Sequence, residues 1–228
     1  MPASDSDEAG SAAAFEPIAL PEPKLEGGVS LADALRLRRT EREFSDRPLS
    51  RQMLSDCLWA ACGINRRNGP FGLTGRTAAS ASNSQEVDVY VALQSGIFRY
   101  EPLSHGLIPV VAGDLRRLAL GARQGDGGPN APVRLIYVAD IGRLEQTRGF
   151  DEPGLHDPDV QKSYCYVDVG LIAGNVYLFA ASRGFAAWFH NCDRTGLSAR
   201  LGLSDRQRPL FGQTVGFPKL SGTGRPAY

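Results

Sequence analysis

The stretch RRTEREF (Arg38–Phe44) brings three guanidinium groups and one hydroxyl together at the point where a helix is expected to end. The planar fork of arginine binds a phosphate through two hydrogen bonds, and a neighbouring threonine hydroxyl adds another donor. If the chain leaves the helix at Arg39 and runs extended, Thr40 and Arg42 point to the same side. The stretch is therefore a candidate phosphate-binding group. The alternative is that Arg38 and Arg39 only complement the negative end of the preceding helix, as basic residues in last turns often do.

The composition limits the class of protein. The chain of 228 residues is long enough for one large domain or two small ones with a substantial core. Its 25 basic and 25 acidic residues cancel, so no overall field draws the chain to nucleic acid or to an anionic membrane. We therefore expect neither partner, and any anion binding has to be local.

The cysteines and the N-terminus indicate the compartment. Cys57, Cys62, Cys165 and Cys192 form no Cys-x-x-Cys pair and have no histidine at ligand spacing, which argues against a metal site and a disulfide scaffold. Residues 1–10 are acidic, and no apolar run typical of a signal peptide follows them. No stretch was expected to approach the roughly 20 apolar residues of a membrane span. The sequence thus predicts buried thiols in a reducing, cytoplasmic setting.

The chain divides into three parts. Residues 1–28 are rich in Ala, Ser, Asp and Pro and predict a flexible N-terminal arm that could wrap a partner subunit. Residues 29–220 form one domain, and residues 221–228 form a C-terminal tail.

Two helices open the domain. Ser30 is a predicted N-cap of the helix that delivers the arginine cluster, with Asp33 as a weakened capping box. Ser50 caps a second helix, which Gly63 ends. The Gly-rich, basic residues 65–78 are expected to form a mobile rim.

Strands follow in the middle of the chain. Residues 87–93 and 97–100 alternate between apolar and polar and predict a hairpin, which a strand at 107–111 extends. A short helix is expected at 114–120, and the dense apolar run at 134–139 is typical of a central strand.

A long helix is predicted at 160–182. Gly170 and Gly174 on it would cost stability unless another backbone packs close, so we expect it between layers or between subunits. One apolar stripe has helical spacing and consists of Tyr164, Val167, Leu171, Gly174, Leu178 and Ala181. The remaining predicted elements are a strand at 185–190, a helix that includes 198–201 and a strand at 210–217. This mixture of elements indicates an α+β or mixed α/β domain.

Four segments in this order resemble the FMN-dependent nitroreductase family, particularly its branch related to azoline-forming peptide oxidases of the SagB type. They are RRTEREF, AASASNSQEVDVYVAL (78–93), DVGLIAGNVYLFAASRGF (168–185) and GQTVGFPK (212–219). The resemblance covers about residues 24 to 219. It implies an α+β nitroreductase-like fold with a central, mostly antiparallel sheet flanked by helices, and a long central helix at a homodimer interface.

The resemblance also implies a site for FMN. Arg38, Arg39 and Thr40 would hold the phosphate and ribityl chain, and Arg42 would reach the pyrimidine edge, where a fixed cation favours the reduced flavin. Asn83 and Gln85 are two residues apart on a segment expected to be extended, so both would face the uracil-like edge of the flavin. The alternative for Asn83 is a turn-forming residue in a Ser/Asn-rich loop.

Further residues are candidates with equally open alternatives. The resemblance brings His190 and Asn191 near the flavin, although the usual glycine is missing there, and His190 could instead be a strand-end histidine bonded to backbone. Cys192 is expected to be an inert buried thiol. Lys219 and Arg225 could add charge for the phosphate or belong to a solvated tail.

By resemblance, the chain is an enzyme: a homodimeric oxidoreductase that takes hydride from NAD(P)H onto FMN and passes electrons to a nitroaromatic, quinone or similar small-molecule acceptor. No catalytic side chain is assigned, because the flavin supplies the reactivity.

Two other functions were considered. One is a dehydrogenase of a peptide or biosynthetic intermediate, with Lys162, Tyr164 or Tyr166 abstracting a proton. Against azoline chemistry, Lys162 and Tyr164 are not adjacent, unlike the Lys-Tyr pair of the azoline oxidases. The other is a non-catalytic nucleotide-binding module.

Overall fold

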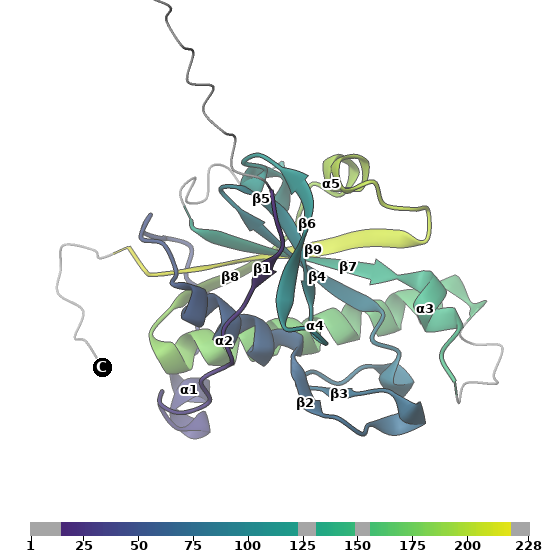
Figure 1. The fold of residues 1–228 in the computed structure, drawn as a ribbon, viewed down its shortest axis with the longest axis horizontal. Helices are drawn as coiled ribbons and strands as arrows, with labels where there is room; N and C mark the ends of the chain where they lie inside the picture. Colours follow the sequence, from purple (N-terminus) through teal and green to yellow (C-terminus); the bar gives the residue numbers. More distant parts are fainter. Residues whose placement is uncertain (1–14, 123–130, 149–155, 220–228) are drawn as a thin grey trace, which may run out of the picture.

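The computed structural model describes residues 15–122, 131–148 and 156–219 of the chain. Within them, seven strands form one sheet in the order β1-β6-β5-β4-β7-β9-β8, and each neighbouring pair is antiparallel (Figure 1). The strands of this sheet are β1 (Ile18–Ala19), β4 (Val87–Leu93), β5 (Gly96–Glu101), β6 (Gly106–Ala112), β7 (Val133–Asp140), β8 (Ala186–His190) and β9 (Gln207–Gly216).

Helices cover both faces of the sheet. α2 (Arg51–Cys62) and α4 (Pro158–Arg183) pack on one face, and α5 (Arg194–Leu201) packs on the other. α1 (Leu31–Leu37) lies against α4, and the short α3 (Ile141–Glu145) follows β7 (Figure 1). The single-turn 3-10 helices are η1 (Pro70–Gly72), η2 (Ala81–Asn83) and η3 (Arg116–Ala119).

The two cores follow from the alternation of side chains along the strands. On β4, Val89 and Val91 point to the face covered by α2 and α4, whereas Tyr90 and Ala92 point to the face covered by α5. Every residue of β7 from Val133 to Ala139 is buried, as expected for a strand covered on both faces.

These observations confirm the predicted α+β class with a mostly antiparallel sheet and a long central helix. The predicted strands are all present, and the predicted short helix at 114–120 is η3. Ser30 and Ser50 cap their helices by accepting the N–H groups of Asp33 and Met53, and Gly63 ends α2 as predicted.

Part of the apolar stripe on the long helix is exposed in the single chain. Val167 and Leu171 of that stripe are 58% and 43% exposed. α4 is apolar on more than one side, so helical spacing alone could not select the side that faces the sheet. The buried residues of α4 are instead Gln161, Cys165, Asp168, Val169, Ile172, Ala173, Val176 and Ala180.

The same helix corrects the expectation about membrane spans. By length and composition, α4 is apolar enough to cross a membrane. In this fold, however, it packs against α1, α2, β8 and β9, and one of its sides belongs to the main hydrophobic core.

Two segments were described too simply from the sequence. Residues 65–78, predicted as a mobile rim, contain η1 and contribute to the two-stranded ribbon of β2 (Ile64–Arg66) and β3 (Gly75–Arg76). In the predicted arm, residues 15–28 lie along the chain's own domain. Leu20 joins the main hydrophobic core, and Arg183 of α4 donates hydrogen bonds to the carbonyls of Lys24 and Glu26, at 3.1 and 2.8 Å.

Candidate cofactor-binding site

The arginine cluster begins where α1 ends. Arg38 is the C-cap residue of α1, and its N–H donates to the carbonyl of Ala34 at 2.8 Å. Arg38, Arg39, Thr40 and Arg42 are all exposed. Arg39 forms an exposed ion pair with Glu41, at 3.2 Å between Nε and Oε2. Because such pairs contribute at most about 1 kcal/mol, an anion can compete for this guanidinium.

Tyr177 of α4 holds the first half of the cluster. Its hydroxyl lies 3.1 Å from Thr40 Oγ1 and accepts the N–H of Phe189 at 2.8 Å. The guanidinium carbon of Arg38 lies 5.6 Å from the centroid of the Tyr177 ring, within the range of a cation–π contact. One side chain therefore contacts both Arg38 and Thr40.

Trp188 of β8 contacts Arg42, the last arginine of the cluster. The Arg42 guanidinium carbon is 5.8 Å from the Trp188 ring centroid. Between the two halves, Glu41 N–H donates to the carbonyl of Ala187 at 2.9 Å. The segment after α1 is thus fastened along β8 with its guanidinium groups facing outward.

Lys219 belongs to the same region. Its N–H donates to the carbonyl of Glu43 at 3.1 Å, and Phe44 forms an isolated antiparallel bridge with Pro218. The backbone of Lys219 is therefore next to that of the arginine cluster. Arg225 lies outside the described residues.

His190 is at the end of β8 and is 4% exposed. Its Nδ1 lies 2.9 Å from the carbonyl oxygen of Asn191, which can only accept, so Nδ1 carries the proton. Nε2 then accepts the hydroxyl of Thr214 at 2.8 Å. Burial lowers the pKa of His190 to about 4, so the ring is neutral near pH 7. With both nitrogens bonded internally, this geometry favours the strand-end interpretation of His190.

The residues next to His190 differ in exposure. Asn191 is exposed, and its carbonyl also accepts the N–H of Gly121 at 3.0 Å. Cys192 is buried, and burial raises the pKa of its thiol to about 11. The protonated thiol is a poor nucleophile, in agreement with the prediction of an inert cysteine.

Asn83 and Gln85 lie together, but their segment is not extended as predicted. Ser82, Asn83 and Gln85 have φ values of 47°, 58° and 50°, a left-handed conformation that is costly outside glycine. The two side chains meet through this tight turn, with Gln85 Nε2 donating to Asn83 Oδ1 at 3.0 Å. The prediction assumed an extended backbone, in which side chains alternate between two sides. Asn can adopt a left-handed backbone, so this assumption failed here.

Both amides are already hydrogen-bonded inside the loop. Asn83 Nδ2 donates to the carbonyls of Pro70 and Thr74, and Gln85 Nε2 donates to Thr74 at 2.6 Å. Arg76 Nε donates to Gln85 Oε1 at 2.7 Å. A flavin edge at this loop would have to replace some of these bonds.

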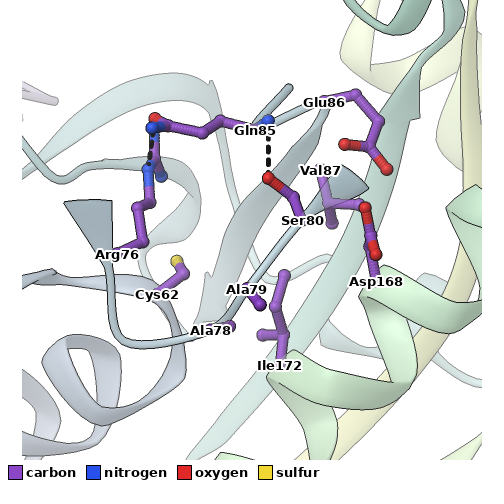
Figure 2. A pocket seen from close by; sticks show the side chains of 10 residues that line it. All are labelled: Cys62, Arg76, Ala78, Ala79, Ser80, Gln85, Glu86, Val87, Asp168 and Ile172. Atoms are coloured by element: carbon purple, nitrogen blue, oxygen red, sulfur yellow. Dashed lines mark hydrogen bonds between the residues drawn. The ribbon is translucent and has the colours of Figure 1, made fainter. Parts of the chain in front are cut away.

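Behind this loop is a small pocket, shown in Figure 2. Asp168 of α4 accepts the N–H of Ala81 at 3.0 Å and so fastens the loop to the central helix. The carboxyl groups of Asp168 and Glu86 lie side by side (Figure 2), and Ser84 donates to Glu86 at 2.6 Å. Burial, followed by the charge of Glu86, raises the pKa of Asp168 to about 7. The pocket is lined by Cys62, Arg76, Ala78, Ala79, Ser80, Gln85, Glu86, Val87, Asp168 and Ile172.

The candidate residues therefore form two groups in one chain. The arginine cluster contacts α4 at Tyr177, and the Asn83 loop contacts it at Asp168. These positions are nine residues apart, or about 13 Å along the helix axis. The lining of the pocket in Figure 2 includes no residue of the arginine cluster.

Sequence reasoning missed Tyr177, Trp188 and Asp168 as contacts of the site. Tyr177 and Asp168 stand within the quoted segment 168–185, yet no role was given to either side chain. The available signal was a carboxylate and a phenol hydroxyl within the apolar run of residues 167–181, because polar groups in such a run need partners.

The chain matches known proteins over most of its length. The family model described as "Nitroreductase family" matches residues 35–217. A curated protein of Methanocaldococcus jannaschii described as a nitroreductase is 31% identical over 163 residues, which are 68% of this chain and 75% of that protein.

Two solved structures are similar to this fold. A Ralstonia eutropha protein described as a nitroreductase has a TM-score of 0.75 and 34% identity, with 90% of this chain and 91% of that chain covered. The NADPH:FMN oxidoreductase of Vibrio harveyi, solved in complex with NAD+, has a TM-score of 0.57 and 19% identity, with 86% and 72% covered. The second likeness concerns the fold alone.

Proposed function

The chain belongs to the nitroreductase family, and from this premise we propose that it is an FMN-dependent oxidoreductase with NAD(P)H as electron donor. The electron acceptor would be a nitroaromatic, a quinone or a similar small molecule. The observation that carries the proposal is the group of exposed guanidiniums and one hydroxyl held along α4 and β8 by Tyr177 and Trp188.

This group fits the phosphate end of FMN. Arg38 and Arg39 would bind phosphate oxygens, and Thr40 would donate its hydroxyl to them. Lys219, whose backbone adjoins the cluster, would add a further positive charge. When bound, FMN supplies the two-electron chemistry between donor and acceptor.

Arg42 has a different proposed role. It would lie beside the pyrimidine edge of the flavin and stabilise the negative charge that accumulates there on reduction. Asn83 and Gln85 would face that same edge after exchanging some of their bonds to Thr74 and Pro70. We assign His190 no contact with the cofactor, because both of its ring nitrogens are bonded within the protein. The exposed side chain of Asn191 stays a candidate contact.

We also propose that the site is completed by a second copy of the chain. On α4, Val167, Gly170, Leu171 and Gly174 are exposed or half-buried at helical spacing. A Cβ added at Gly170 or Gly174 would meet no atom within 4 Å, so this surface is open to another backbone. Such a stripe is typical of a helix that packs on its symmetry mate.

The proposed dimer would also bring the two groups together. If two α4 helices cross antiparallel on a twofold axis near Ile172, Gly170 of one copy faces Gly174 of the other. The same operation sets the neighbourhood of Tyr177 opposite that of Asp168 in the second copy. The arginine cluster of one chain and the Asn83 loop of the other would then border one cofactor. We propose a homodimer on this basis. A cytoplasmic location is proposed separately, because Cys57, Cys62, Cys165 and Cys192 are free thiols.

A visible absorption spectrum of the purified protein tests the proposal. We expect yellow protein, or protein that becomes yellow with added FMN, and bleaching when NADPH or NADH is added without oxygen. Turnover of a peptide-like substrate with oxygen and without NAD(P)H would favour the specialised dehydrogenase instead. Protein that stays colourless with FMN would contradict both enzymatic functions and favour the nucleotide-binding module.

The role of Arg42 has its own test. Arg42→Ala should slow anaerobic reduction by NADPH about 10- to 100-fold, because the fixed cation beside the pyrimidine edge is lost. Arg67→Ala is the matched control, since Arg67 is also exposed but lies on the β2–β3 ribbon. Stopped-flow absorbance at saturating flavin measures the rate of flavin reduction in each variant. Equal rates in the two variants would count against the assignment.

A further inference from the structure

We infer that Tyr177 is a positioning residue for the phosphate of the cofactor, acting through Arg38 and Thr40. The inference rests on the proposed function and assigns a role to a residue that the four family-like motifs leave without one. Three contacts carry it: the hydroxyl to Thr40, the ring to Arg38, and the backbone N–H of Phe189 to the hydroxyl.

The Tyr177 hydroxyl is held in place by a hydrogen bond from the backbone N–H of Phe189, and we call this bond the anchor of Tyr177. β8 is the last strand of the sheet and pairs on one side only, with β9. The N–H of Phe189 points away from β9, and the Tyr177 hydroxyl accepts it at 2.8 Å. An edge N–H without a partner costs free energy, so this bond fixes the position of the tyrosine oxygen.

Either hydroxyl can donate in the hydrogen bond between Tyr177 and Thr40, and we infer the direction in which Tyr177 donates. Since the Tyr177 oxygen accepts from Phe189, its own proton is available for Thr40 Oγ1 at 3.1 Å. Thr40 then uses its lone pair for Tyr177 and keeps its proton for an acceptor outside the protein. Thr40 is exposed, so that acceptor would be a ligand oxygen. A phosphate oxygen meets this requirement, because it accepts and does not donate at neutral pH.

The ring of Tyr177 acts on Arg38. A guanidinium at 5.6 Å from an aromatic centroid is attracted to the ring, and contact with the ring restricts where its five donors can point. Arg38 is otherwise an exposed residue at a helix end, where side-chain freedom is large. Tyr177 therefore reduces the entropy that phosphate binding has to remove from both donors.

The test compares the affinities of FMN and riboflavin, which share the isoalloxazine ring and differ in the phosphate. Tyr177→Phe keeps the ring but removes the hydroxyl. We expect it to weaken FMN binding about 3- to 10-fold and to leave riboflavin binding unchanged, because the hydroxyl that orients Thr40 is lost and the bond to Phe189 N–H, lost with it, does not involve the phosphate. Tyr177→Leu, which also removes the ring under Arg38, should weaken FMN binding further. Fluorescence quenching of each flavin measures the affinities.

Two controls separate positioning from folding. Tyr90→Phe removes a hydroxyl from a buried tyrosine on the α5 side of the sheet and should leave the ratio of the two affinities as in the wild type. Thr40→Val combined with Tyr177→Phe should cost no more than Thr40→Val alone, since the tyrosine acts through Thr40.

The outcomes distinguish this inference from the proposed function. If the wild type prefers FMN to riboflavin and Tyr177→Phe keeps that preference, the role of Tyr177 is refuted and the function stands. Equal weakening of both flavins also refutes it, because that result indicates a structural role only. If the wild type binds neither flavin, the proposed function falls, and the inference falls with it.

Discussion

At the scale of single residues, Asp168 and Glu86 are the most unusual pair. Asp168 is 3% exposed and Glu86 is fully buried, and the two carboxyl groups lie side by side beneath the loop that carries Asn83. Two carboxylates this close cannot both ionise cheaply. The raised pKa of Asp168, about 7, reflects burial first and the charge of Glu86 second.

This pair predicts a pH dependence of stability. The folded-state pKa of Asp168 is raised above its unfolded value, so its contribution is fully present below about pH 4 and is lost as pH rises through 7. Asp168→Asn cannot ionise, and it keeps an oxygen for the N–H of Ala81. The wild type should therefore lose about 3 kcal/mol relative to Asp168→Asn between pH 4.5 and 8. Urea unfolding at several pH values measures the difference.

The stability of the wild type is compared with that of Asp168→Asn because His190 changes the stability with pH in the opposite direction. Its pKa is lowered to about 4, so its contribution is present above about pH 6.5 and is lost as pH falls. Both proteins share that trend, which cancels. Asp205→Asn, on an exposed loop, serves as the control and should follow the wild type. Parallel curves for the wild type and Asp168→Asn would contradict the assignment.

The anion-binding chemistry of the arginine cluster could be predicted from its residue types. The side chains that hold the cluster in place could not. Three guanidiniums and a hydroxyl in RRTEREF indicate an anion site whatever the fold. The partners Tyr177 and Trp188 are more than 130 residues away in the chain, and only packing of α4 and β8 brings them there. Asn83 and Gln85 lie together as predicted. The prediction assumed an extended backbone, whereas both residues have a left-handed backbone.

At the scale of elements, Gly212 of β9 lies close to both of its neighbours, η3 and β8. A Cβ there would lie 2.4 Å from the carbonyl oxygen of Ala119 and 2.6 Å from Cε1 of His190. His190 cannot move aside easily, because Thr214 and Asn191 hold both ring nitrogens. The approach of η3 and β8 to β9 thus depends on the absence of a side chain at this position.

We expect Gly212→Ala to destabilise the protein by about 2–3 kcal/mol, as overpacking against fixed backbone does. Gly142→Ala in α3 is the comparison, because the one atom within 4 Å of a Cβ on this helical residue is Oδ1 of the Asp140 side chain, at 3.2 Å. It should be neutral or stabilise by up to about 1 kcal/mol through helix propensity. Chemical denaturation at one protein concentration compares them, and an unchanged midpoint for Gly212→Ala would show that the contact can relax.

Long elements were predictable, and of the shortest ones only η3 was. The strands of the sheet from β4 onward and the helices α2 and α4 have enough alternation or helical spacing to be recognised. β1, β2, β3 and α3 contain two to five residues each, too few for a period to be visible. These elements form because neighbouring chain offers hydrogen bonds, which is information outside the local sequence.

At the scale of the whole molecule, the proposed dimer links assembly to cofactor binding. Gly170→Leu adds a side chain at an exposed position of α4 where a Cβ meets no atom within 4 Å, so the single subunit should still fold. Because the second copy would supply the Asn83 loop, this variant should be monomeric and should bind FMN at least 10-fold more weakly. Analytical ultracentrifugation with and without FMN measures both properties.

Arg200→Leu is the matched control for that experiment. It places the same leucine on an exposed residue of α5, across the sheet from α4, and should leave both the oligomeric state and the flavin affinity unchanged. A Gly170→Leu protein that remains dimeric, or one that is monomeric and binds FMN normally, would separate the interface from the site and disprove the proposed link.

The place of β9 has a consequence for biosynthesis. In the sheet, β9 lies between β7 and β8, so one edge of β7 is paired only by β9. β9 leaves the ribosome roughly 70 residues after β7, a delay of about 4–14 s at ordinary translation rates. During that interval an almost wholly apolar strand has one unpaired edge. Nascent chains stalled before residue 207 should therefore recruit chaperones or aggregate, whereas chains released after residue 216 should not.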